Sequence, residues 1–202
     1  MIITSPEFSQ MEKRYRANFF NTLSGYKSAN LLGTISNNKN TNLAIFNSVI
    51  HLGANPPLMG FILRPISVER HTYDNIISSG DYTINHVHEA IIGKSHQTSA
   101  KYDKNVSEFE ECGFTPEYIQ NFKAPFVQEA FIKIGLKFKE EIIIKSNETI
   151  LMVGEILLVQ IKEEFIESNG AINLPSAKTV TISGLDTYLK AEQIKKLSFA
   201  RP

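Results

Sequence analysis

This sequence of 202 residues has a single cysteine, no tryptophan and no excess of either charge. Cys112 alone cannot form a disulfide within the chain, which suits a reducing compartment, by default the cytoplasm. Basic and acidic residues each number 21, which argues against a globally basic nucleic-acid binder. The longest apolar run is interrupted by Glu155 and is shorter than the roughly 18 residues of a membrane helix. We therefore expect neither a nucleic-acid nor a membrane partner. Residues 1–16 lack the pattern of a secretory signal, so we do not expect one.

Common catalytic and cofactor motifs are also missing. Without a GxGxxG sequence no Rossmann domain is predicted, and the P-loop-like Gly93-Lys94-Ser95 has His88 where the upstream glycine belongs. His86 and His88 share one face of a strand, but no further ligands accompany them, so we expect no metal site. Cys112 lies in EFEECGF, where neighbouring carboxylates should raise the thiol pKa. We name no catalytic residue.

The pattern that is present is mainly β. Residues 28–36 and 41–52 flank the turn-forming Asn37-Asn38-Lys39-Asn40, which predicts a hairpin in which asparagine adopts the left-handed conformation. Further strands are predicted at LMGFILR, DYTINHV, FIKIGLKFKEEIII, TILMVGEILLVQIKEE and AKTVTISG, and a polar tail follows the last of them. Helices are predicted at 9–23, at 72–80 with Gly80 as the end signal, and at SEFEEC. With no repeat or linker, residues 1–202 are predicted to be one domain, a closed or partly closed antiparallel barrel with a few peripheral helices.

Small residues interrupt the strand NLAIFNSVIHL. Alternation places Ala44 and Ser48 on one face, where they leave room for a ligand to approach the backbone. The alternative is that they only ease packing against another strand, and this stretch alone favours neither interpretation.

The segment RPISVERHTYDNI places charge at a predicted helix start. Thr72 stands where an N-cap residue is expected, and the free N–H groups of a helix N-terminus favour a phosphate. Arg64, Arg70 and His71 could add charge-assisted hydrogen bonds. The alternative is that Thr72 only caps the helix and the arginines are solvated, which the motif by itself favours.

Taken in order along the chain, several segments resemble the flavin reductase-like, split-barrel FMN-binding family. This family includes reductase components of two-component monooxygenases and flavoredoxin-type electron carriers. The resemblance runs from about Leu31 to Gly154. It rests on LLGTIS, NLAIFNS with NPPLMGF, RHTYDNI, YTINHV, HQTSAKY, SEFEECGFTP, KAPFVQEAF and TILMVGEI.

The resemblance implies a split antiparallel β-barrel that binds FMN, or FAD, and works as a homodimer. It further implies that NAD(P)H passes a hydride to flavin N5 and that a monooxygenase or electron-transfer protein receives the electrons. The flavin ring or ribityl chain would contact the strand at 46–49, the phosphate would lie at the helix start, and two further segments would line the pocket. The implied flavin-contacting residues are Phe46, Asn47, Ser48, Val49, Arg64, Arg70, His71, Thr72, Asn85, Gln97, Thr98 and Ser99.

The chain also departs from the family pattern. Ile45 stands where proline is common, Asn47 where serine is common, and His71 where aspartate is frequent. Many reductases carry a histidine where this chain has Glu148, so the departures bear more on reductase activity than on flavin binding. Three readings stay open: a flavin reductase, a flavoredoxin-like carrier reduced by a partner protein, and a split-barrel protein that acts through protein contacts alone. Activity like that of pyridoxamine-phosphate oxidase is a further variant.

Overall fold

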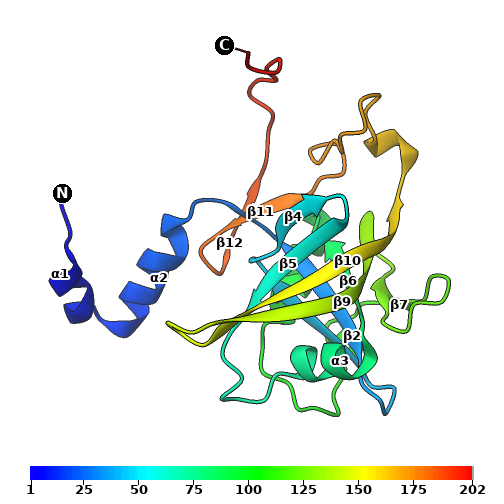
Figure 1. The fold of residues 1–202 in the computed structure, drawn as a ribbon, viewed down its shortest axis with the longest axis horizontal. Coiled ribbons are helices and arrows are strands. Elements are labelled where there is room, and N and C mark those ends of the chain that lie inside the picture. The colour runs from blue at the N-terminus through cyan, green and yellow to red at the C-terminus, as the bar shows by residue number, and fades with distance from the viewer. Residues whose placement is uncertain (202) are drawn as a thin grey trace.

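Seven antiparallel strands form the main sheet of the protein, described here for residues 1–201 of a computed structural model (Figure 1). The strand order is β3-β2-β6-β9-β10-β5-β4, so the two edge strands are consecutive in the chain. The link between these edge strands hydrogen-bonds to β5, which confirms the predicted mainly β, split-barrel fold. The strands are β2 (Asn30–Ile35), β3 (Thr41–Phe46), β4 (Ile50–Ala54), β5 (Pro57–Leu63), β6 (Asp81–His86), β9 (Ile132–Ile144) and β10 (Thr149–Ile161).

Two small sheets and short helices complete the fold. One small sheet has the order β1-β11-β12 and the other is the pair β7-β8. Their strands are β1 (Lys27–Ser28), β11 (Val180–Ser183), β12 (Thr187–Lys190), β7 (Pro116–Glu117) and β8 (Phe126–Val127). The helices are α1 (Ser5–Gln10), α2 (Lys13–Leu23), α3 (His71–Ser79), α4 (Ile92–Gln97) and α5 (Glu108–Glu111), with 3₁₀ turns at Glu89–Ile91 and Glu163–Phe165.

The barrel interior is filled by alternate residues of the strands. Phe61 and Tyr82 are fully buried there, with ring centroids 5.7 Å apart in an edge-to-face arrangement. Gly154 of β10 faces this pair, and a Cβ at that position would lie 2.1 Å from the Tyr82 hydroxyl oxygen. The glycine is therefore needed for the tyrosine ring to fill the centre of the barrel.

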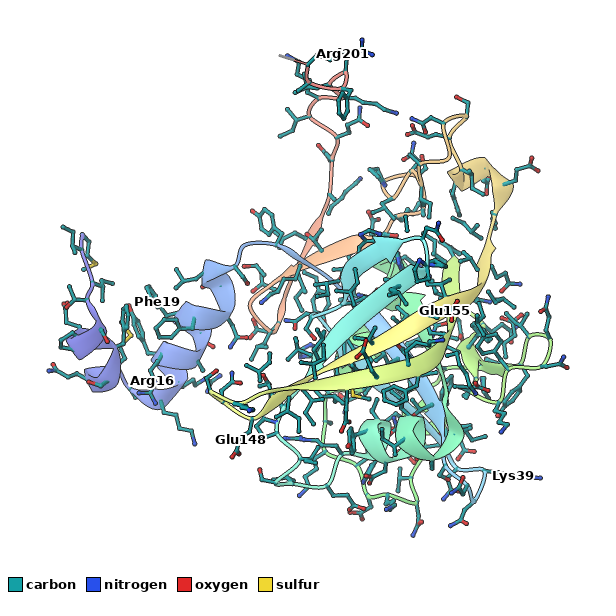
Figure 2. The ribbon with its side chains drawn as sticks, viewed as in Figure 1. Arg16, Phe19, Lys39, Glu148, Glu155 and Arg201 are labelled. Carbon is teal, nitrogen blue, oxygen red and sulfur yellow. The ribbon has the colours of Figure 1, made fainter. Side chains whose placement is uncertain are left out.

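The predicted hairpins and the helix at 72–80 are present, but their details differ from the prediction. The β2–β3 turn uses Lys39 (φ 65°), not an asparagine, in the left-handed conformation, and Figure 2 shows this residue at the tip of the turn. Glu148 (φ 60°) takes the same role between β9 and β10. α3 ends at Gly80, whose φ of 74° is the left-handed cap that glycine adopts without strain.

Three predicted elements were wrong in extent. The helix expected at 9–23 is two helices, because Glu12 caps a new one with its carboxylate on the N–H groups of Arg14 and Tyr15. The strand expected over 41–52 is broken at 47–49, where β3 ends and the chain turns to β4. The expected polar tail contains β12, which pairs with β11.

Both ends of the chain extend away from the barrel (Figures 1 and 2). α1 and α2 contain no buried residue, although Phe20 packs edge-to-face against both Phe8 and Phe19. Residues 191–201 form no regular element, and Phe199 is largely exposed. Among residues 1–201 there is no helix with the length and apolar character that crossing a membrane requires.

Candidate functional site

A cavity of about 930 Å³ opens where the barrel is split. Its walls are the end of β3 with the following link, the segment that leads into α3, the loop between α4 and α5, and the β11–β12 turn. The volume lies near the upper end of the range of about 300–1,000 Å³ that is typical of small-molecule and cofactor sites. The cavity is therefore large enough for an extended ligand.

One wall is the 47–49 link, and it is held by side-chain hydrogen bonds. The Ser48 hydroxyl donates to the carbonyl oxygen of Ile62 and accepts from its N–H, both at 3.1 Å. The Asn47 amide donates to the carbonyl oxygen of Gly184 in the β11–β12 turn at 2.8 Å. Within residues 1–201 the main-chain N–H groups of Asn47 and Ser48 make no hydrogen bond, and the small Ala44 lines the same wall. The link thus offers main-chain donors beside the small side chains of Ala44 and Ser48.

A second part of the lining, called the cationic end below, is rich in cationic side chains. Arg64 and Arg70 come from the segment before α3, and Lys101 and Lys104 from the loop between α4 and α5. The Arg70 Nε donates to the carbonyl oxygen of Pro65 at 3.3 Å, which fixes the arginine beside the start of α3. A helix N-terminus with several cations is suited to an anion such as a phosphate.

Thr72 lies at this end, but it is not the N-cap residue that the sequence suggested. α3 begins at His71 and is preceded by Arg70 at the cap position, where no side chain caps the helix. The Thr72 hydroxyl is turned inward and accepts a hydrogen bond from the Asn42 amide at 3.2 Å. The first N–H groups of the helix are consequently not satisfied by a capping side chain.

Two carboxylates at this end lie in very different surroundings. Glu69 is exposed and pairs with Lys104 (2.6 Å), whose hydrogen bond lowers the Glu69 pKa. Glu108 is buried, and its Oε2 accepts from the main-chain N–H of Leu43 at 3.0 Å. Burial raises the pKa of Glu108, an effect opposed by its hydrogen bonds and by nearby His71. The cavity thus combines one exchangeable carboxylate with one fixed carboxylate.

The cavity brings together most of the residues that the sequence pointed to. Those that line it are Phe46, Asn47, Ser48, Arg64, Arg70, His71, Thr72, Thr98 and Ser99. The Thr98 and Ser99 hydroxyls donate to carbonyl oxygens of Ser95 and His96 in α4. Their contact with a flavin stays a prediction.

Three of the predicted residues lie elsewhere. Asn85 is fully buried, and its amide bonds to Leu31, Thr83 and the N–H of Val127. Val49 packs against the barrel core, and the Gln97 amide donates to the Tyr102 hydroxyl. None of the three lines the cavity. Asn85 was expected at the pocket from the family resemblance, but its side chain satisfies buried main-chain groups instead of lining the cavity.

From the sequence, His51 and His86 are weak candidates to approach the nicotinamide, but neither lines the cavity. His51 is exposed on β4, while burial lowers the pKa of His86 to about 4, so His86 is neutral near pH 7. Cys112 is buried, and its thiol pKa is raised chiefly by this burial and further by Glu108 and Glu111. This agrees with its expected inertness.

Sequence reasoning missed two parts of the lining. One is the β11–β12 turn, which contributes Leu185 and Asp186 and had been assigned to a tail. The other is the loop 100–104, where Lys101 and Lys104 reach the cavity. The only signal was the pair of lysines in SAKYDKN, directly after residues already predicted to line the pocket.

Comparison with known proteins identifies the family. The model of the "Flavin reductase like domain" matches residues 23–174. This chain belongs to the flavin reductase-like family. A solved structure of a flavin reductase candidate with a split barrel domain from Shewanella frigidimarina NCIMB 400 is 48% identical, with a TM-score of 0.95, over 99% of this chain and 100% of that one.

More distant structures share the flavin reductase-like fold. Nitrilotriacetate monooxygenase component B from Bacillus cereus is 20% identical with a TM-score of 0.86, over 98% of each chain. Flavoredoxin of Desulfovibrio vulgaris (Miyazaki F) is 22% identical with a TM-score of 0.77, over 89% of this chain and 94% of that one. At such identities the likeness concerns the fold alone. Membership in the family supports a flavin-related function and a flavin cofactor for this chain.

Proposed function

We propose that this chain binds FMN in the 930 Å³ cavity and acts as an NAD(P)H-dependent flavin reductase. The observation that carries the proposal is that one cavity joins a link with free main-chain donors to a cationic helix start. A flavin mononucleotide has the matching parts, a flat ring rich in hydrogen-bond acceptors and a phosphate at the end of a flexible chain.

The residues present fit the ring at the 47–49 link. The free N–H groups of Asn47 and Ser48 can donate to the ring's carbonyl oxygens and nitrogens, and the small Ala44 permits close approach. The two hydrogen bonds from Ser48 to Ile62 hold this backbone in place before the ligand arrives. Such preorganisation lowers the entropic cost of binding.

The residues at the other end fit the phosphate. Arg64 and Arg70 can bind phosphate oxygens in a bidentate manner, and the N–H groups at the start of α3 are uncapped. Because this end borders the open loop 100–104, the adenylate half of FAD could extend outward, so FAD is a second possible ligand.

When bound, the flavin would supply the chemistry itself, by accepting a hydride from the nicotinamide at N5. The work of the chain is to hold the flavin and to leave one ring face open to NAD(P)H. No side chain of the cavity is required as a general acid or base. A carrier of the flavoredoxin type would use the same residues but would take its electrons from a protein. In either case, a monooxygenase or another electron-transfer protein would receive the electrons from the flavin.

The visible absorption spectrum tests the proposal. Purified protein is titrated with FMN and then reduced with NADH or NADPH without oxygen. A bound-flavin spectrum that bleaches supports the reductase, while one that stays oxidised supports the carrier. If FMN does not bind, the third reading, a barrel that acts only through protein contacts, is favoured.

We also infer that the chain forms a homodimer. α2 has no buried residue, and Ile194, Leu197 and Phe199 near the C-terminus are exposed, so both ends of the chain carry apolar side chains without a covering surface. A second copy of the chain is the occupant we propose. Sedimentation equilibrium should give twice the chain mass, and a monomer at micromolar concentration would refute it.

A further inference from the structure

Glu69 connects two segments that border the cationic end of the cavity. Its Oε1 lies 2.6 Å from the Lys104 Nζ and its Oε2 lies 3.8 Å from the His71 Nε2. Glu69 precedes α3, whereas Lys104 belongs to the loop between α4 and α5, so the carboxylate spans the edge of the cavity. Both of its oxygens face cationic or protonatable groups that line the end of the cavity proposed for the phosphate.

The contact is one that water and other anions can exchange. The Glu69 and Lys104 side chains are 54% and 56% exposed, and ion pairs in such surroundings are weak and screened by salt. Glu108, by contrast, is buried and tied to a main-chain N–H. Among the described residues that line the cavity, Glu69 is the only acidic one in an ion pair. It is therefore the negative charge best placed to compete with an incoming anion.

We propose that Glu69 is a built-in competitor for the phosphate of the flavin, an inference that rests on the proposed binding of FMN. The Glu69 carboxylate contacts Lys104 and His71, and a phosphate monoester must displace it to bind. On release, the carboxylate returns to the same groups. Glu69 thereby keeps the flavin exchangeable, as a substrate that enters and leaves, and it acts only on flavins that carry a phosphate.

The test compares Glu69→Gln with the wild type. Dissociation constants and release rates are measured for FMN and for riboflavin, which has the same ring and no phosphate. We expect FMN to bind about two- to fivefold more tightly to the variant, the range set by an exposed ion pair, and to leave more slowly. Riboflavin affinity should not change, and the gain for FMN should shrink at high salt.

Two further variants separate pairing from charge. Asp103→Asn removes a carboxylate from the same cavity that makes no ion pair or side-chain hydrogen bond among the described residues, so it reports the effect of charge alone. It should have a smaller effect than Glu69→Gln. In the Lys104→Gln background, Glu69→Gln should increase the affinity for FMN by less than it does in the wild type, because the ion pair between the two residues is already lost.

The outcomes distinguish this inference from the proposed function. Suppose that the wild type binds FMN. If Glu69→Gln then binds FMN no more tightly than the wild type, or gains as much affinity for riboflavin as for FMN, Glu69 is not a competitor for the phosphate. The proposed function stands in either case. A gain of equal size in Asp103→Asn would also overturn the inference. If the wild type does not bind FMN, the proposed function fails and this inference fails with it.

Discussion

The two ends of the cavity are built in opposite ways. At the 47–49 link the polar side chains are committed to the fold, as Ser48 bonds to Ile62 and Asn47 to Gly184. At the start of α3 the Glu69 and Lys104 side chains are more than half exposed, and the ion pair between them can exchange. This difference is the basis of our proposal that the link binds the ring by preformed geometry, while the other end binds the phosphate by charge.

Arg70→Ala should have the largest effect, because it changes the end of the cavity proposed to bind the phosphate. Loss of a charge-assisted hydrogen bond to phosphate, about 1.5–3 kcal/mol, should weaken FMN binding about 10- to 100-fold and leave riboflavin binding unchanged. Fluorescence titration with both ligands measures the split. Arg16→Ala on exposed α2 is the matched control and should change neither affinity. An equal loss for both ligands would place Arg70 at the ring.

Ser48→Ala should act on the other end. It removes both hydrogen bonds to Ile62 and leaves that residue's N–H without its partner, at a cost of about 1–3 kcal/mol in the free energy of unfolding. Because the link is then less well fixed, FMN and riboflavin should both bind several-fold more weakly. Urea unfolding and the same titrations measure this, with exposed Ser67→Ala as the control. A loss confined to FMN would contradict the assignment of the ring to this end.

Asn47→Ser should have a smaller effect at the same end. The shorter side chain loses the bond to the Gly184 carbonyl oxygen, which is worth about 0.5–1.5 kcal/mol. The β11–β12 turn should then open more often, which would appear as faster amide hydrogen exchange across residues 183–187. Unchanged exchange there would show that the turn is held by other contacts.

Glu108→Gln should change the pH dependence of stability and little else. Burial raises the pKa of Glu108 above 4.5, so the folded state holds the proton more tightly than the unfolded chain. Its contribution to stability is present at low pH and is lost as pH rises from about 4.5 through the raised value. The glutamine still accepts from Leu43 N–H but cannot ionise, so this decline should disappear from urea unfolding between pH 4 and 7. An unchanged decline would assign it to other groups.

The fold could be predicted from sequence because its main signals are local and periodic. The 13-residue strands β9 and β10 and the helix that ends at Gly80 each carry such a signal. The break at 47–49 could not be predicted, because the reason for it is Ser48 bonding to Ile62, a partner 14 residues away. β12 was missed because its strand is short and is defined by pairing with β11.

The candidate site could be predicted only in part for the same reason. Residue type and position placed Arg64, Arg70 and Ser48 at the cavity. For Asn85, the sequence did not show which side of the strand its side chain lies on, and its amide satisfies buried main-chain groups. Lys104 was overlooked because its role depends on the path of a loop between α4 and α5.

We propose that one end of the cavity binds the flavin ring and the other end binds its phosphate. Parallel titration of the wild-type protein with FMN and riboflavin, at low and at high salt, tests it most directly. The account predicts that both ligands bind, that FMN binds much more tightly, and that salt weakens FMN alone. Equal affinities with equal salt dependence, or no binding of either flavin, would contradict it.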